Sequence, residues 1–179
     1  MMSDLDFAAD HFALFGLPRS QQLDSAALDL RFRQLQTEVH PDRHVQAGDA
    51  GQRLSMQWAS RVNEAYQTLK NPLRRALYLL QLTGHDPQVE NNTAMPADFL
   101  FRQMELRESV AEARRDGDEG VLEAARLQLV QEIAAVHRRL IELMDGEHEY
   151  VAASGLVRQL MFQEKLLGEI DDALEVVAS

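Results

Sequence analysis

The stretch Val39-His40-Pro41-Asp42-Arg43 separates two helical patterns and decides how the first part of the chain folds. One pattern ends at Val39, and the other opens near Arg53. Pro41 lacks a main-chain N–H and disfavours helix at the preceding residue, so we expect His40 to leave the helix. The predicted result is a short exposed turn that presents an imidazole and a carboxylate. By itself, a His-Pro-Asp tripeptide is a weak motif and favours a plain helix stop over a binding turn.

Composition predicts an all-α protein. The chain has 179 residues, 45% of them hydrophobic, which suffices for one ordinary domain or two small ones. Aromatic residues make up only 6%, and Leu, Ala, Glu, Gln and Arg are frequent, as is typical of helices. The sequence contains no cysteine, which excludes disulfides, thiolate metal sites, thiolate-held iron–sulfur clusters and thiol nucleophiles.

Two further features of the sequence concern location and charge. The acidic N-terminus does not resemble a signal peptide, and no apolar run approaches the ~18 residues of a membrane span, so we expect a cytoplasmic protein without a membrane partner.

Residues 1–85 carry nine basic and nine acidic side chains, whereas residues 86–179 carry nine and twenty. This step suggests two units with different partners, and it argues against nucleic acid as a partner of the second.

The first part of the chain predicts three helices that pack as a small hairpin domain. Gly16 followed by Pro18 ends a short helix over residues 11–15, because glycine readily adopts the left-handed cap conformation. Asp24 is placed to cap a second helix, and a third helix follows a loop over 44–52. Short connections make the two long helices antiparallel, with the His-Pro-Asp turn near the tip. The predicted apolar positions are Leu28, Phe32, Leu35 and Val39, then Leu54, Trp58, Val62, Ala65/Tyr66 and Leu69.

Four stretches of this part resemble, in order and spacing, the J-domain co-chaperone family. They are Phe15-Gly16-Leu17-Pro18, the basic second helix, His40-Pro41-Asp42-Arg43, and Asn63-Glu64-Ala65-Tyr66-Gln67-Thr68-Leu69 followed by Pro72. The resemblance implies that the turn and the basic helix dock on a DnaK-type chaperone and stimulate its ATPase. The contact residues that it implies are His40, Pro41, Asp42, Arg43, Arg31 and Arg33, with Arg43 in place of the family's usual Lys.

Elementary electrostatics fits such a contact. The Asp42 carboxylate can accept a bidentate hydrogen bond from an arginine of the partner. Arg31 and Arg33 are two positions apart, so they fan across the helix. Together they would steer the domain toward an acidic surface, an effect that acts mainly on the association rate and weakens as salt rises.

The predicted domain boundary lies after the Thr83-Gly84 helix stop. The segment 85–96, which contains two prolines and Asn91-Asn92, is the only plausible linker. We therefore expect a J-domain at 1–84, a linker at 85–96 and a second domain at 97–179.

The second domain predicts a three-helix bundle. Its helices are expected at 96–115, 119–144 and 147–177, joined by short turns at Asp116-Gly117-Asp118 and Asp145-Gly146 that make neighbours antiparallel. The middle helix has apolar residues at Leu122, Ala125, Leu129, Ile133, Val136, Leu140 and Leu143. The stripe of the third helix is Ala153, Leu156, Leu160, Leu167, Ile170 and Leu174.

Helix 96–115 is apolar on two sides. At about 100° per residue, one sector holds Phe99, Leu106, Val110 and Ala113, and the opposite sector holds Leu100, Phe101, Met104, Glu105 and Glu108. A three-helix bundle buries only one of these sectors, so the second predicts an exposed apolar patch edged by carboxylates, as at partner-binding sites. We expect Phe162, which lies off the core stripe of its helix, to join this patch. The alternative is that the J-domain packs over these residues.

The second domain also carries a narrower resemblance. Phe99-Leu100-Phe101-Arg102-Gln103-Met104-Glu105-Leu106-Arg107-Glu108 and Val157-Arg158-Gln159-Leu160-Met161-Phe162 resemble the C-terminal, oligomerisation-type domain of the HscB family, J-domain proteins of iron–sulfur cluster assembly. The resemblance implies that the scaffold protein IscU binds this surface and that the chaperone partner is HscA. The implied scaffold-binding residues are Leu100, Phe101, Met104, Glu105, Glu108 and Phe162. Phe101 and Met104 replace other apolar residues that relatives often carry.

The sequence does not predict an enzyme. A di-iron bundle needs paired Glu-x-x-His motifs, and none occurs here. No Gly-rich phosphate loop is present, so we expect ATP to bind the partner chaperone, and we expect no catalytic residue, cofactor or metal. The alternatives that remain are a J-domain adaptor for a different client acting with a general DnaK chaperone, a bundle that dimerises, and a helical metalloenzyme.

Overall fold

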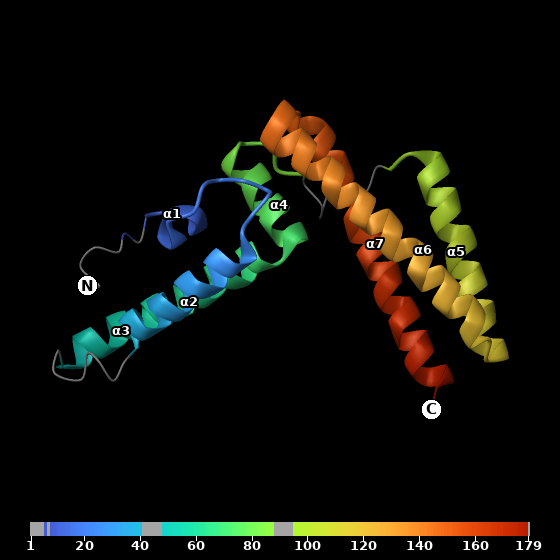
Figure 1. The fold of residues 1–179 in the computed structure, drawn as a ribbon, viewed down its shortest axis with the longest axis horizontal. Coiled ribbons are helices and arrows are strands. Elements are labelled where there is room, and N and C mark those ends of the chain that lie inside the picture. Colours follow the sequence, from blue (N-terminus) through green and yellow to red (C-terminus); the bar gives the residue numbers. More distant parts are fainter. Residues whose placement is uncertain (1–5, 7, 41–47, 88–94, 179) are drawn as a thin grey trace. The chain divides into compact units, whose positions relative to one another are not determined.

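The computed structural model describes residues 6, 8–40, 48–87 and 95–178, and Figure 1 labels their elements. These residues form helices and no strand, which confirms the predicted all-α class. The helices are α1 (His11–Phe15), α2 (Ser25–Val39), α3 (Gly48–Lys70), α4 (Pro72–Leu82), α5 (Ala97–Asp116), α6 (Glu119–Ile141), the π-helix η3 (Glu142–Glu147) and α7 (Tyr150–Val177). In the described part of the chain, no helix is long and apolar enough to cross a membrane.

The chain forms two compact units, Met1–Leu79 and Leu80–Ser179, so the division falls within α4. In the first unit, α2 and α3 pack along each other as a hairpin (Figure 1). The Asp24 carboxylate caps α2, as predicted, by accepting hydrogen bonds from the N–H groups of Ala26 at 2.9 Å and Ala27 at 3.1 Å. The fully buried side chains that the two helices share are Leu28, Leu35, Val39, Trp58, Val62, Ala65 and Leu69.

Helix α1 packs against α3 and is tied to α4. The main-chain N–H of His11 donates a hydrogen bond to the Tyr78 hydroxyl at 3.0 Å, and the two rings stack with centroids 4.2 Å apart. Gly16 ends α1 in the left-handed conformation, with φ 65°, as the sequence predicts. The Arg61 guanidinium donates to the Ala9 carbonyl at 2.7 Å, which fastens the segment before α1 to α3.

Helix α3 begins earlier than the sequence predicts. Residues 48–52 of the expected loop over 44–52 are helical, because α3 starts at Gly48. Leu54 is 42% exposed instead of lying in the core. None of residues 48–54 is buried, and the first buried residue of the helix is Ser55. A solvent-exposed helical turn leaves no apolar period in the sequence, so pattern analysis cannot recognise it.

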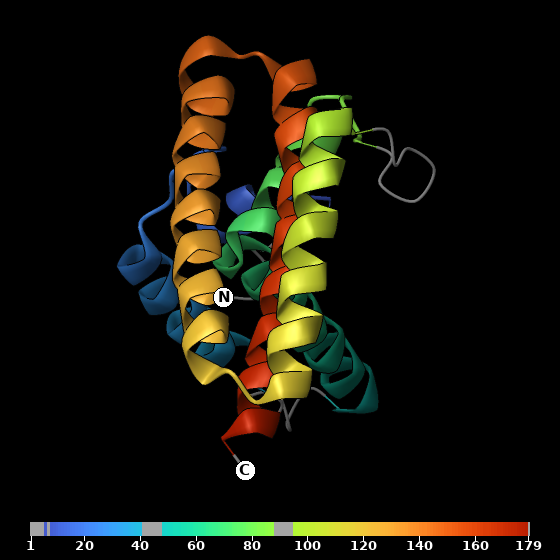
Figure 2. The same ribbon diagram turned by 90° about the vertical axis from the view of Figure 1, so that its right-hand side faces the viewer.

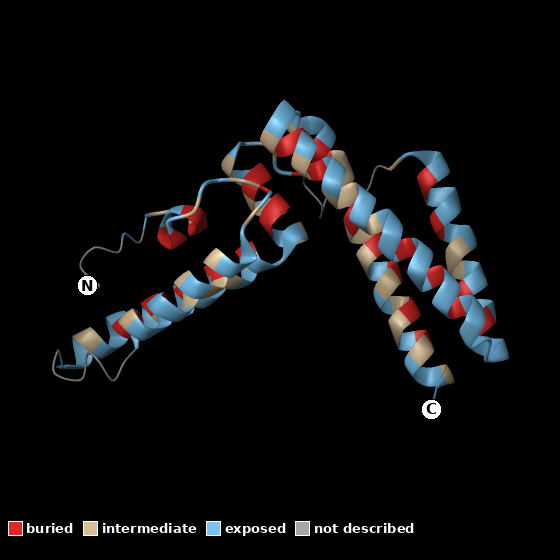
Figure 3. Ribbon diagram, viewed as in Figure 1, coloured by how far each residue is buried: buried red, intermediate tan, exposed pale blue. Residues whose placement is uncertain are grey.

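In the second unit, α5, α6 and α7 lie side by side as the predicted three-helix bundle (Figure 2). Figure 3 shows buried positions recurring along α6 and α7. The shared core contains Val110, Ala113, Leu122, Ala125, Leu129, Leu166, Ile170 and Ala173, with Leu106 and Ile133 partly buried against it. Burial of each large apolar side chain contributes about 1.5–3 kcal/mol to stability.

The connection from α6 to α7 differs from the prediction. The chain continues past Ile141 as a π-helix through Glu147, so the expected turn at Asp145-Gly146 lies within helical structure. The turn comes at His148, which has a left-handed φ of 56°, and α7 starts at Tyr150. Leu143 and Met144 are buried in the π-helical segment, and their burial outweighs the ~1 kcal/mol that glycine costs in a helix.

The buried stripe of α7 is wider than predicted. Ala153, Leu160 and Ile170 are buried as expected, whereas Leu156, Leu167 and Leu174 are only half-buried. The other buried residues of α7 are Ser154, Val157, Gln163, Leu166 and Ala173. Because α7 packs against both α5 and α6, two adjoining faces of this helix are covered.

The predicted linker over 85–96 includes residues 88–94, which lie outside the described residues. Its first residues contact α7. The Ser154 hydroxyl donates to the His85 carbonyl at 3.1 Å, and the Arg158 guanidinium donates to the Pro87 carbonyl at 3.3 Å. His85 and Pro87 are thus held against α7 within the second unit.

Candidate functional site

The end of α2 presents His40 at a groove between α2 and α3. His40 has an extended backbone, with φ −63° and ψ 128°, so the helix ends at Val39, as predicted. The side chain of His40 is exposed. The groove has a volume of about 660 Å³, and its walls include Arg33, Gln36, Thr37, His40, Ala59 and Asn63.

The structure separates the two arginines that the sequence assigns to the chaperone contact. Arg33 lines the groove beside His40. Arg31 does not line it, and its guanidinium lies 3.6 Å from the Glu38 carboxylate. An exposed pair of this kind contributes about 0–1 kcal/mol, so it restrains Arg31 only weakly. The remaining predicted contacts, Pro41, Asp42 and Arg43, lie outside the described residues.

Sequence reasoning did not identify the other walls of the groove. Gln36 and Thr37 are neutral residues near the end of α2, and no periodic pattern distinguishes them from ordinary surface. Asn63 belongs to the stretch that resembles J-domains, and this membership is the signal that could have placed it near the turn.

Helix α5 carries the second candidate surface. Phe99 and Val110 are each only 6% exposed and face the bundle, whereas Leu100, Phe101 and Met104 are 37%, 61% and 60% exposed. The described residues thus bear out the expected opposition of a buried and an exposed apolar sector. We call Leu100, Phe101 and Met104, with the exposed carboxylates of Glu105 and Glu108, the apolar patch.

Phe162 lies beside α5 but is half-buried. Its ring packs edge-on against Phe99, with centroids 6.2 Å apart. Phe162 therefore adjoins the helical turn that carries Leu100 and Phe101, and part of its surface is used within the bundle. It lies closer to the core than the other residues that the sequence assigns to scaffold binding.

Among the described residues, no group of three or more His, Asp or Glu side chains is close enough together to hold a metal ion. The two candidate surfaces offer a histidine with an arginine in the first unit and apolar side chains with carboxylates in the second. These groups suit the binding of protein partners.

Comparison with known proteins identifies the family. A family model described as the HSCB C-terminal oligomerisation domain matches residues 95–171. The co-chaperone protein HscB homolog of Azoarcus sp. (strain BH72) is 49% identical over 173 residues, which cover 97% of this chain and 98% of the relative. The solved structure of HscB from Vibrio cholerae is 34% identical, with a TM-score of 0.83 over 94% of this chain and 99% of that one. Human co-chaperone protein HscB is 28% identical, with a TM-score of 0.85 over 93% and 82% of the two chains. This chain therefore belongs to the HscB co-chaperone family.

Proposed function

We propose that this co-chaperone is an adaptor for iron–sulfur cluster assembly. Its first domain, 1–84, stimulates the ATPase of a DnaK-type chaperone of the HscA kind. Its bundle, 97–179, binds an IscU-type scaffold protein and delivers it to that chaperone, with 85–96 as the linker. Membership of the HscB family supports this role, and the presence of a candidate surface on each unit supports the division of labour.

The observation that carries the proposal is the exposure of Leu100, Phe101 and Met104 on a helix whose opposite side is buried. Burial of apolar surface stabilises a complex by about 25 cal/mol for each Å² removed from water. Large apolar anchors at the centre of an interface contribute most of the binding energy, and a polar rim adds specificity. Glu105 and Glu108 supply such a rim for basic residues of the scaffold.

The chaperone contact relies on the turn after α2. His40 and Arg33 share one groove, so a chaperone surface bound there meets both side chains. The Asp42 carboxylate pairs with an arginine of the chaperone in a charge-assisted contact. ATP binds and is hydrolysed in the chaperone, and this protein changes only the rate.

A steady-state ATPase assay with the HscA-type chaperone tests the first half of the proposal. The wild-type protein should raise the hydrolysis rate, and Asp42→Asn, which keeps the shape but removes the charge, should not. His40→Gln should fail likewise. Both variants should bind the scaffold and melt as the wild type does. Equal stimulation by Asp42→Asn and wild type would show that the turn is only a helix stop.

Calorimetric titration with the IscU-type scaffold tests the second half. The full-length protein should bind the scaffold with 1:1 stoichiometry, and sedimentation of the protein alone should show no self-association through the patch. If the protein instead dimerises, and Leu100→Ala abolishes the dimer, the patch is a contact between copies and the client role is wrong.

A further inference from the structure

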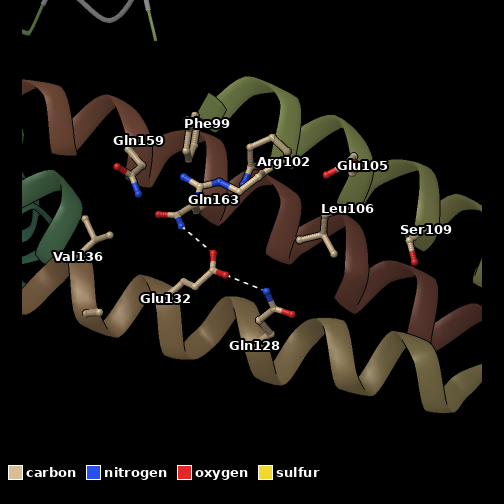
Figure 4. Close-up of a pocket in the computed structure, with 12 residues that line it drawn as sticks. Phe99, Arg102, Glu105, Leu106, Ser109, Gln128, Glu132, Val136, Gln159 and Gln163 are labelled. Carbon is tan, nitrogen blue, oxygen red and sulfur yellow. Dashed lines mark hydrogen bonds between the residues drawn. The ribbon is translucent and has the colours of Figure 1, made fainter. Parts of the chain in front are cut away.

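A polar cleft opens between α5 and α6, with α7 behind it (Figure 4). Its volume is about 710 Å³. Phe99, Leu106, Ala135 and Val136 give its walls an apolar part. The polar side chains, for which we name it the polar cleft, include Arg102, Gln103, Glu105, Gln128, Glu132 and Gln163. Glu105 also edges the apolar patch, so the cleft and the patch adjoin each other along α5.

Two buried amide oxygens at the polar cleft, those of Gln103 and Gln163, lack hydrogen-bond donors among the described residues. The Glu132 carboxylate accepts hydrogen bonds from Gln128 Nε2 at 3.0 Å and from Gln163 Nε2 at 3.4 Å. The second bond directs Nε2 of Gln163 to the Glu132 carboxylate, so Oε1 of Gln163 can accept from another donor. The side chains of Gln163 and Gln103 are 2% and 5% exposed, and neither Oε1 has a hydrogen-bond partner among the described residues. Buried acceptors without donors cost free energy, which a donor from a bound molecule would recover.

The charges of the polar cleft also favour a ligand that carries hydrogen-bond donors. Glu105 from α5 and Glu132 from α6 place two carboxylates at the cleft, and neither forms an ion pair within the described part of the chain. The Arg102 side chain extends from α5 toward Gln163 (Figure 4). The cleft thus combines surplus acceptors and a net negative charge with one cationic donor. An extended peptide with a basic side chain complements this set, because its N–H groups donate and its carbonyls accept.

We propose that the polar cleft receives a lysine- or arginine-bearing peptide segment of the scaffold protein that binds the apolar patch. The basic side chain pairs with Glu132. Main-chain N–H groups of the segment donate to Oε1 of Gln103 and Gln163 after a small rotation of these side chains, and Arg102 donates to a main-chain carbonyl. The continuity at Glu105 supports one occupant for both surfaces, so this inference rests on the proposed function.

The test is calorimetric titration of the variant Glu132→Gln with the IscU-type scaffold at low and at high salt. The variant keeps the shape of the side chain and removes its charge, so the dissociation constant should rise about 5- to 20-fold at low salt. The difference from wild type should shrink as salt rises. Glu123→Gln is the matched control, because Glu123 is an exposed carboxylate on the same helix that does not line the cleft, and its dissociation constant should stay at the wild-type value.

A second pair of variants separates this inference from the proposed function. Leu100→Ala combined with Met104→Ala should weaken scaffold binding whether or not the cleft is used. If that pair weakens binding while Glu132→Gln and Glu123→Gln both bind like wild type, the cleft proposal is overturned and the proposed function stands. If the pair also binds like wild type, the proposed function itself is wrong. Thermal melting of each variant verifies that the bundle is intact.

Discussion

The hydroxyl of Ser55 donates a buried hydrogen bond to the main-chain carbonyl of Val39, joining the first buried turn of α3 to the last residue of α2. The last four carbonyls of an α-helix have no partner within the helix, and this bond satisfies one of them. It also fixes the point from which the chain leaves for His40. A serine of α3 therefore holds the end of α2 in place next to His40.

Replacing Ser55 with alanine should lower the unfolding free energy of the first domain by about 1–3 kcal/mol, because the buried Val39 carbonyl loses its donor. Trp58 is the only tryptophan and is 1% exposed, so its fluorescence during denaturation reports on this domain. Stimulation of the chaperone ATPase should also fall, since the end of α2 next to His40 is held less firmly. Ser60→Ala, at an exposed position of the same helix, is the control and should change neither quantity. Unchanged stimulation by Ser55→Ala would limit the hydrogen bond to a role in stability.

The two arginines of α2 should differ in their effect on association with the chaperone. Arg33→Glu should slow the on-rate about 3- to 10-fold, because Arg33 lines the groove beside His40. Arg31→Glu should have a smaller effect, because Arg31 lies outside the groove and is already close to Glu38. Stopped-flow measurements over a range of salt provide the test, and the wild-type rate should fall as salt rises. An association rate that does not depend on salt would show that electrostatic steering plays no part.

The two sides of α5 should respond differently to truncation. Replacing Leu100, Phe101 and Met104 together with alanine should cost far less stability than the ~2–5 kcal/mol of each buried large-to-Ala change, and should abolish scaffold binding. Val110→Ala should do the reverse: it should lower the melting temperature and leave binding by the folded protein intact. Thermal melting and calorimetric titration together decide the question. A strongly destabilised triple variant would mean that these residues are buried in solution and that the binding site lies elsewhere.

The first domain should lose stability in mild acid through His11. Burial lowers the pKa of His11 below its ordinary value of 6.5, while the negative charge of Glu64 raises it and the positive charge of Arg61 lowers it further. The folded domain therefore binds fewer protons than the unfolded chain, so its unfolding free energy falls as pH drops below about 6.5. Denaturation followed by Trp58 fluorescence at about pH 7.5 and about pH 5.5 measures this loss. His11→Phe should reduce it, and an equal loss in the variant would assign the pH dependence to other groups.

Apolar periodicity predicted the elements that bury one clear face. The bounds of α2 follow from Asp24 at its start and Pro41 beyond its end, which are local effects that the sequence displays directly. The opposed sectors of α5 also follow from the sequence, because a helix places each residue at a known angle. The exposure of Leu100, Phe101 and Met104 required the further assumption that the bundle has only three helices.

Features that depend on tertiary packing or on neutral polar residues could not be predicted. The polar cleft has glutamines from three helices on its walls, and amide side chains give no periodic signal. Gly146 indicates a turn by its low helix propensity, yet the burial of Leu143 and Met144 keeps the chain helical there. Ser55 looks like an ordinary polar residue in a helix until the end of α2 is placed beside it.

The two apolar sides of α5 give this helix two possible rotational settings about its own axis. Charge distinguishes them, because at the level of the buried Val110 and Ala113 the outer side carries the exposed carboxylates of Glu108 and Glu112. Half a turn of rotation would carry these carboxylates into the core, where an unpaired charge is strongly unfavourable. The apolar patch therefore stays exposed, although its apolar side chains would also suit a core. Enlarging Ala113 should therefore detach α5 from the bundle instead of turning it, and the surface that the helix presents to partners would be lost with it.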